Sequence, residues 1–533
     1  MILPEDDRRA RAIALAFLVL APLAYGALTL SFGMDANWDL RNYHWYNAYA
    51  FLNGRIGFDR LVAQMPSFYN PLIDVPFYLA ATHLPARAAG FLLGAVQGIN
   101  VSLAFALALV TLRVPDEGKR VWLAVALAAM AGLGGGTLGL LGTTFYDNVT
   151  SLGVLGAALV VLAGLPRLLD GPPAPAFARV AVAGLLAGAA MGLKNTSVMY
   201  AVGLCLAFLV LPCGYWRRLW LAFFFGVGVL AGIALFGGYW MAHLWQEYGN
   251  PLFPHMNHIF RSPFAAPDDY RNTSFFPEAL WERVLFPVLF TFQPLRVGEV
   301  PWFDLRVLVL YVLVPVAALA RLPAPRGEIF THAAATRYLL TALAVAYAVW
   351  AYMFGIYRYL VPMEMLAPLA IVMAAGLLPA PRAAKALLAG VLLLAVQATV
   401  TAADWGRVPW SRQWVEADVP PVERPDETMV LMAGYWAISH VVPLFPPQVP
   451  FVRIQSNFLQ PDSVGNGYLG VVQKRVREHR GRFLMLSTIP DTPGAAKAAA
   501  LMGLTLDAGD CRVIPNNLGE PLNLCAVHRE RVE

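Results

Sequence analysis

Charged side chains are scarce in this sequence. Of its 533 residues only 14% are Asp, Glu, Lys or Arg, whereas 58% are hydrophobic and the mean hydropathy is +0.56. Soluble globular domains carry about 25% charged residues, so this composition excludes an ordinary soluble enzyme and indicates a polytopic α-helical membrane protein. The net charge of +5 says little by itself, and no nucleic-acid partner is expected.

Cysteine is also rare, with four residues in the chain. Cys205 and Cys213 fall in or beside an apolar run, where packing is their expected role. Cys511 and Cys525 fall in two short strand-like runs joined by the turn-rich segment PNNLGEP. In an oxidising compartment we expect a disulfide between them, and two buried free thiols are the alternative.

Long apolar runs, in contrast, occur along most of the chain. About 20 apolar residues cross the hydrocarbon core of a bilayer, and the backbone there must satisfy its own hydrogen bonds, so we expect each run to be a helix. The first run could instead be a cleaved signal peptide. About eleven spans are predicted, at 12–32, 88–112, 121–141, 150–166, 179–194, 196–212, 219–242, 305–321, 338–356, 359–378 and 386–404.

The basic residues predict the orientation of these spans. With a cytoplasmic N-terminus, every short inner segment is basic, as the positive-inside rule expects. An odd number of spans then places the C-terminal end in the periplasm of a bacterial inner (plasma) membrane. The residues behind this prediction are Arg8, Arg9, Arg11, Arg113, Lys119, Arg120, Arg167, Arg217, Arg218, Arg326, Arg337, Arg382 and Lys385.

Three of the outer regions are too long to be simple loops between spans. They are 33–87, 243–304 and 405–533. The first two belong to a membrane module over 1–404, and the run 279–290 in the second could lie along the membrane interface as an amphipathic helix. The third region has β-like runs at 428–434, 450–456 and 482–488, separated by helix-like stretches at 437–444, 468–480 and 494–503. Such alternation predicts a small α/β domain outside the membrane.

Charges are almost absent from the predicted spans, and the exceptions gather at their outer ends. Because a buried charge in a membrane is costly, each needs a partner or a function. We expect these residues to converge on one outward-facing cavity, and they are Asp35, Asp39, Asp147, Lys194, Arg358 and Glu364.

Each of these residues also has a structural alternative. Arg358 and Glu364 could pair with each other, Lys194 could be an interfacial anchor, and Asp147 could be a helix N-cap. One of the two first-loop aspartates, Asp35 or Asp39, could cap a helix that begins near Leu40. If 39–52 is helical, Asp39, Tyr43 and Tyr46 share one face.

The order of these motifs resembles the integral-membrane glycosyltransferases of the GT-C superfamily, which include the lipid A aminoarabinose transferase and the protein O-mannosyltransferases. The matching stretches are Asp39 with the aromatic helix that ends at Gly54, FYNPLIDVPFYL (68–79), YDNVTSLGVL, GLKNTSVMY, WQEYGNPLFPHMNHIFRSP (245–263) and YRYLVPMEML. The resemblance covers roughly residues 12–404. An adjacent pair of acidic residues that is frequent in the family is absent here, which leaves the choice between Asp35 and Asp39 open and weakens any claim of a bound metal.

The resemblance implies an inverting glycosyltransferase that moves a sugar from a polyprenyl-phosphate donor to a glycan, lipid or protein acceptor. Asp39 or Asp35 would be the catalytic carboxylate, and Lys194 and Arg358 would bind the donor phosphate. The expected substrate contacts are Tyr43, Tyr46, Asp147, Glu364 and His243. No cofactor is certain, and a divalent metal is possible. The rival readings are a transporter or flippase of a lipid-linked saccharide, and a non-catalytic assembly partner.

Overall fold

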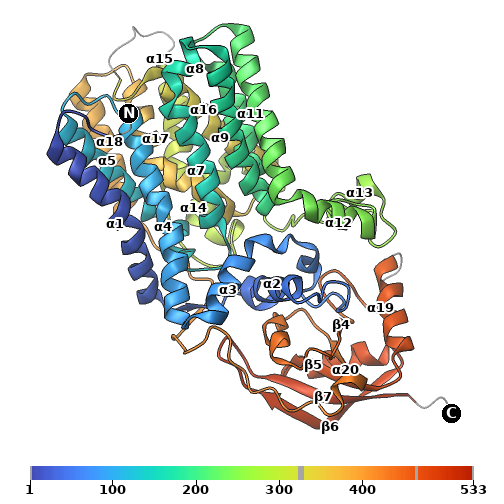
Figure 1. Cartoon of the computed structure of the whole chain (residues 1–533). Coiled ribbons are helices and arrows are strands. Elements are labelled where there is room, and N and C mark those ends of the chain that lie inside the picture. The colour runs from blue at the N-terminus through green and yellow to red at the C-terminus, as the bar shows by residue number, and fades with distance from the viewer. Residues whose placement is uncertain (1–2, 322–328, 463–465, 531–533) are drawn as a thin grey trace.

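Most of the chain is helical. The computed structural model describes residues 3–321, 329–462 and 466–530, and Figure 1 shows a helical bundle above a small sheet domain. Among the described residues, six helical segments are long and apolar enough to cross a membrane. They are α1 (Arg8–Phe32), α4 (Ala86–Thr111), α9 (Pro173–Leu193), α11 (Tyr215–Phe236), α16 (Ala333–Met353) and the segment Tyr357–Leu377, which contains α17 (Val361–Leu377).

The other five predicted spans also fall on helices, but on shorter ones. A helix of 17 residues is only about 26 Å long, somewhat less than the hydrocarbon core of about 30 Å. Eleven crossings therefore stay a prediction, and Arg326 of the orientation argument lies outside the described residues. The five helices are α5 (Glu117–Gly132), α7 (Asp147–Ala163), α10 (Val198–Leu206), α15 (Arg306–Arg321) and α18 (Arg382–Ala398).

Small residues let the bundle helices approach closely. Between α9 and α11, a Cβ atom added to any of four glycines would lie 2.0–2.4 Å from a carbonyl oxygen of the partner helix. Small residues at such contacts are typical of membrane helix pairs. Almost every side chain of α17 is buried, so this helix forms the centre of the bundle. The four glycines are Gly184, Gly188, Gly228 and Gly232.

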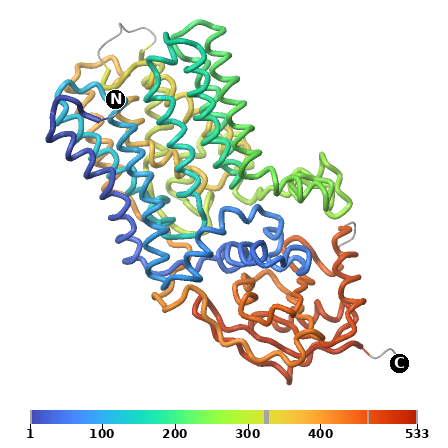
Figure 2. The backbone as a smooth tube through the Cα atoms, viewed as in Figure 1, coloured from blue at the N-terminus to red at the C-terminus, as the bar shows by residue number. Residues whose placement is uncertain are grey.

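The first loop forms a layer of its own at one end of the bundle. It contains β1 (Met34–Asp35), a π-helical turn η1 (Leu40–His44), α2 (Trp45–Leu52) and α3 (Val75–His83). Figure 2 shows this blue segment between the helices and the orange and red domain.

The second outer region contains short helices joined by irregular loops. It follows α12 (Gly238–Tyr248) with α13 (Asn257–Phe260) and α14 (Leu280–Phe292). The predicted helix over 279–290 is therefore present as α14, which exposes Leu280 and Trp281 while it buries Phe286 and Phe290.

The C-terminal region folds as the expected small domain. Its five-stranded sheet has the order β4-β3-β5-β7-β6, with β3 parallel to β4 and β5 and the β5-β7-β6 part antiparallel. Two helices, α19 (Gly467–Glu478) and α20 (Thr492–Ala500), connect the strands, while the predicted helix over 437–444 is a 3-10 helix, Ser439–Leu444. The strands are β3 (Thr428–Met432), β4 (Phe451–Arg453), β5 (Arg482–Thr488), β6 (Leu504–Ile514) and β7 (Leu522–Arg529).

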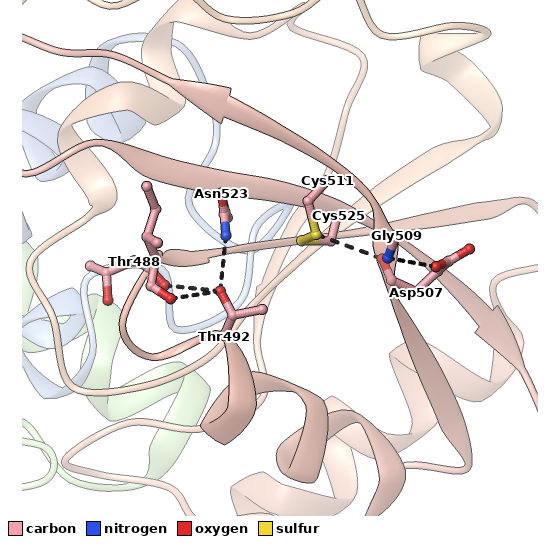
Figure 3. Close-up of a disulfide and its surroundings, with 8 residues drawn as sticks. Thr488, Thr492, Asp507, Gly509, Cys511, Asn523 and Cys525 are labelled. Atoms are coloured by element: carbon pink, nitrogen blue, oxygen red, sulfur yellow. Dashed lines mark hydrogen bonds between the residues drawn. A yellow bond between two sulfur atoms is a disulfide. The ribbon is translucent and has the colours of Figure 1, made fainter.

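A disulfide joins the last two strands. Cys511 of β6 and Cys525 of β7 are direct partners in the antiparallel ladder and are bonded through their sulfur atoms. In Figure 3 the neighbouring Asn523 donates to the hydroxyl of Thr492, which fixes the start of α20 to the same hairpin. Cys205 and Cys213 are free thiols.

The first loop is hydrogen-bonded to this domain at several points. β1 pairs antiparallel with β2 (Arg407–Val408), directly after the bundle. Arg60 pairs with Val452 of β4, and the buried guanidinium of Arg453 donates to the carbonyl of Val62. The loop is therefore held from two sides, by the bundle and by the C-terminal domain.

Candidate functional site

A wide helical turn determines which side chains of the first loop face the bundle. In η1 the amide of Trp45 donates to the carbonyl of Leu40, five residues back. In such a π turn, residues four and five apart share a face, whereas α-helical neighbours are three and four apart. Tyr43 lies beside Asp39, and the ring of His44 packs against that of Tyr43 at 4.0 Å between centroids. Single π turns of this kind occur frequently at functional sites.

Asp39 lies among groups that orient its carboxylate. The hydroxyl of Tyr43 donates to Oδ2 at 3.0 Å, and Nη1 of Arg358 lies 3.5 Å from the same oxygen. The side chain retains 17% exposure. Burial raises the pKa of Asp39 above its usual value, and the charges of Arg358 and Lys194 oppose this shift. A partly buried carboxylate of raised pKa, with one face open, is a plausible proton acceptor.

The two predicted cations lie beside this carboxylate. Nζ of Lys194, at the end of α9, lies 2.6 Å from Oδ1 of Asp147 and 2.7 Å from the carbonyl of Phe145. Nη1 of Arg358 lies 4.0 Å from Oδ2 of Asp147, and its guanidinium packs over the ring of Phe145 at 4.0 Å. Asp39, Asp147, Lys194 and Arg358 thus form one cluster, although they come from four separate elements.

Asp147 does not act as an N-cap. The N-cap residue of α7 is Tyr146, which has a left-handed backbone conformation with φ of 62° and ψ of 6°. Such a conformation is uncommon for a residue other than glycine and is often found at functional sites. Asp147 follows as the first helical residue, and its side chain pairs with Lys194 instead.

Sequence reasoning missed a third carboxylate of the cluster. Oε1 of Glu299, from the second outer loop, lies 3.4 Å from Nη2 of Arg358, and Oε2 accepts a hydrogen bond from the indole of Trp405 at 3.0 Å. Glu299 is the most exposed member, at 42% of its side chain. Its position in the outer region 243–304 was the only signal in the sequence.

A buried histidine and aspartate pair adjoins the cluster and was also missed. Nδ1 of His44 and Oδ1 of Asp74 are 2.6 Å apart. Burial lowers the pKa of His44 well below its usual value, and the charges of Lys194 and Arg358 add to this shift. Burial also raises the pKa of Asp74 well above its usual value. Both shifts favour the neutral forms of the two side chains.

Several buried polar atoms of this region make no hydrogen bond within the described part of the chain. They are Nε2 of His44, the hydroxyl of Tyr146, Oδ2 of Asp147 and Nε of Arg358. Buried polar groups are nearly always paired in native proteins, so each exception needs an explanation. Here the four atoms belong to contacting or adjacent residues, since the rings of His44 and Tyr146 meet edge-on at 4.8 Å. They are available to a polar ligand.

The structure separates Asp35 from this cluster. Its carboxylate is fully buried and accepts hydrogen bonds from the amide and hydroxyl of Thr144 and from the amide and side chain of Asn37. Neither aspartate caps the loop helix, because the side chain of Asn37 accepts from the amide of Leu40 instead. Asp35 is an anchor between β1 and the turn before α7, and of these two aspartates it is Asp39 that faces Arg358.

Glu364 is likewise an anchor, and it does not pair with Arg358. Its carboxylate accepts from the amides of Gly136 and Thr137, from the hydroxyl of Thr137 and from the hydroxyl of Tyr357. These contacts hold the short helix α6 (Gly135–Gly139) against α17. Glu364 lies in the first turn of α17, and the sequence pattern does not predict which groups its carboxylate contacts.

Tyr46 and His243 lie away from Asp39. The π turn shifts the register of the helix, so Tyr46 points to the other side and donates to Oδ2 of Asp59 at 2.8 Å. His243 is on α12, and both residues line a second hollow. Among the described residues, no group of three or more His, Cys, Asp and Glu side chains has an arrangement that could hold a metal ion.

Comparisons of the chain with protein-family models, with curated proteins and with solved structures give no match. The resemblance to the GT-C superfamily therefore remains an expectation, and the function must be argued from the cluster itself.

Proposed function

We propose that the protein is a glycosyltransferase that uses a polyprenyl-phosphate-linked sugar at the outer face of the bacterial inner membrane. The observation that carries this proposal is the position of Asp39. Its carboxylate is oriented by Tyr43 and lies 3.5 Å from Arg358, with Lys194 held on the far side of Asp147. A proton acceptor and two cations thus meet at one end of a set of apolar helices.

In the proposed reaction, an acceptor hydroxyl oxygen attacks the anomeric carbon of the donor sugar. The new bond forms on the face opposite the phosphate, so the configuration inverts. Asp39 takes the hydroxyl proton, and the bond between the anomeric carbon and the phosphate oxygen breaks with its electron pair on the phosphate. Placing both reactants against one carboxylate supplies orientation and general-base catalysis.

The leaving phosphate gathers negative charge, which Arg358 and Lys194 are suited to stabilise. A guanidinium offers a planar set of donors, and a lysine ammonium acts as a point charge. Three carboxylates pair with these cations, namely Asp39, Asp147 and Glu299. Nε of Arg358 still has no hydrogen-bond partner among the described residues, so the cluster retains donor capacity for a phosphate.

The finer topology is part of this proposal. Eleven helices, a cytoplasmic N-terminus and a periplasmic C-terminal domain would place the cluster at the outer membrane surface. The transporter alternative gains no specific support, because transporter sites usually lie near the bilayer midplane on broken helices. Here the cluster forms at helix ends, at the start of α7, the end of α9 and the turn before α17.

The experiment is a transfer assay with purified protein in lipid nanodiscs. The protein receives radiolabelled polyprenyl-phosphate hexoses and pentoses together with an extract of bacterial envelope glycans and lipids, and the release of polyprenyl phosphate is measured. We expect release by the wild-type protein and by Asp510→Asn, a matched control at an exposed position. Asp39→Asn should slow release by about 10³-fold. A wild-type protein that releases no polyprenyl phosphate from any donor refutes the proposal.

A further inference from the structure

A second hollow lies beside the proposed site. It contains about 540 Å³ of space, a figure that includes the solvent at its open mouth. Its walls come from three places, namely the first loop, α12 and α19 of the C-terminal domain. In Figure 1, α2, α12 and α19 come together on one side of the molecule.

Aromatic rings make up much of the lining. Tyr69, Trp240, Tyr248 and Tyr468 all border the hollow, and the indole of Trp240 is fixed by a hydrogen bond to the carbonyl of Phe68 at 2.8 Å. Tyrosine and tryptophan present an apolar ring face together with a polar edge. A sugar ring has the matching character, with an apolar C–H face and hydroxyl groups around its rim.

The polar groups of the lining divide into two sets. Asp59 is fully engaged, because it accepts from Tyr46, from two nitrogens of Arg55 and from the amide of Phe451. This set holds the first loop against the C-terminal domain. The imidazole of His243, in contrast, makes no hydrogen bond within the described residues and only contacts the ring of Trp240, at 5.0 Å between centroids. It is therefore free to bind hydroxyl groups.

The hollow connects to the proposed catalytic carboxylate through two tyrosines. The ring of Tyr69 lies edge-on to that of Tyr43, at 5.6 Å between centroids, and the hydroxyl of Tyr43 donates to Asp39. The rings of Tyr69 and Tyr43 would therefore lie between a saccharide in the hollow and Asp39. A donor must keep its lipid among the membrane helices and its phosphate at Arg358 and Lys194, so the hollow suits the other substrate.

We infer that this hollow binds a saccharide residue of the acceptor, with His243 as a hydrogen-bonding group and the aromatic rings as its apolar floor. The inference rests on the proposed function, because it assigns the acceptor side of that reaction. The saccharide could belong to a glycolipid or to a water-soluble glycan. The shared chemistry is a sugar ring presented from outside the membrane.

The test separates binding from transfer. Hydrogen–deuterium exchange of the full-length protein in nanodiscs is followed with the glycolipid fraction and, separately, with the water-soluble glycan fraction of a bacterial envelope extract. We expect one fraction to protect 55–71 and 238–248 in the wild type and in the α12 control Gln246→Ala, which is exposed outside the hollow. His243→Ala should lose the protection, and His243→Gln should retain part of it. Absence of protection by both fractions overturns the inference.

Kinetics provide the second readout. We expect His243→Ala to raise the KM for the protecting fraction by about fivefold, the loss typical of one hydrogen bond, while the KM for the donor stays within about twofold of the wild-type value. An equal rise in the KM for the donor and in the KM for the protecting fraction overturns the inference, because His243 would then act on the donor site around Asp39. Protection without any donor turnover would refute the proposed function and leave the saccharide site standing.

Discussion

Replacement of Asp39 by Asn is the sharpest perturbation of the proposed site. The amide has nearly the same shape, and its oxygen still accepts the hydrogen bond from Tyr43, but it cannot take up a proton. Loss of a general base typically costs 10²- to 10⁴-fold in rate. We therefore expect kcat for transfer to fall by about 10³-fold.

The same substitution should not weaken donor binding. At 3.5 Å the gross attraction between the carboxylate and Arg358 is on the order of 5 kcal/mol at an effective dielectric constant of 20, much of it offset by desolvation. Its removal leaves Arg358 freer to bind phosphate. The KM for the donor should therefore fall or stay constant while kcat falls.

Stability gives a further check with a defined sign. Because burial raises the pKa of Asp39, the folded state holds its proton more tightly than the unfolded state does. The contribution of Asp39 to stability is therefore fully present below the usual aspartate pKa and is lost as the pH rises through the raised value. At neutral pH, Asp39→Asn should thus leave the Tm unchanged or raise it, measured by differential scanning fluorimetry.

The pH dependence of the transfer rate gives a further measurement. Transfer by the wild type should fall as the pH decreases through the raised pKa of Asp39, because the base must be ionised. Radiolabelled donor and thin-layer separation of the products suffice for these measurements. Full turnover by Asp39→Asn would refute the assignment of Asp39 as the base. A loss of turnover together with a lowered Tm would also refute it, because the loss would then follow from destabilisation of the fold.

Four other outcomes are expected. Asp35→Asn should lower the free energy of unfolding by about 1–3 kcal/mol, because the amide leaves a buried donor of Thr144 or Asn37 unpaired, as chemical denaturation can measure; unchanged stability would contradict the anchoring role. Arg358→Lys should raise the KM for the donor by about tenfold, because the planar N–H donors of the guanidinium are lost. An unchanged KM would show that Arg358 does not bind the donor phosphate. Cys511→Ser should cost the C-terminal domain about 3 kcal/mol, from the constraint on a loop of roughly 15 residues, detected as a lower unfolding midpoint that reducing agent does not change further. Reporter fusions after residue 420 should be active only on the periplasmic side, and a cytoplasmic signal would overturn the proposed orientation.

The sequence predicted where most helices and three strands lie along the chain because its patterns are regular. Each predicted apolar run lies on a helix, and the three β-like runs of the last region overlap β3, β4 and β5. The pairing of Lys194 with Asp147 was within reach for the same reason, because both residues mark the same end of neighbouring helices. Whether the shorter helices cross a membrane is a separate question that sequence and helix length together leave as a prediction.

The remaining features of the site depend on local geometry that has no periodic pattern. The π turn adds a residue to the helical register, so the ring of His44 packs beside that of Tyr43, and Tyr46 bonds to Asp59 and not to the cluster. The direction of the Glu364 side chain was not predictable either. Glu364 lies near the start of α17, but its carboxylate accepts a hydrogen bond from Thr137 of α6. Glu299 comes from an irregular loop, and nothing in its sequence neighbourhood indicates which cation it meets.

The ribbon of β1 and β2 has a consequence for biosynthesis. Met34 and Asp35 obtain their ladder partners from Val408 and Arg407, which leave the ribosome more than 370 residues later. The amino-terminal loop must therefore wait, unpaired, until the whole helical section has been made. A chain truncated before Arg407 lacks the partner strand of β1, so it should have no activity rather than reduced activity. Its first loop would also be exposed to proteases.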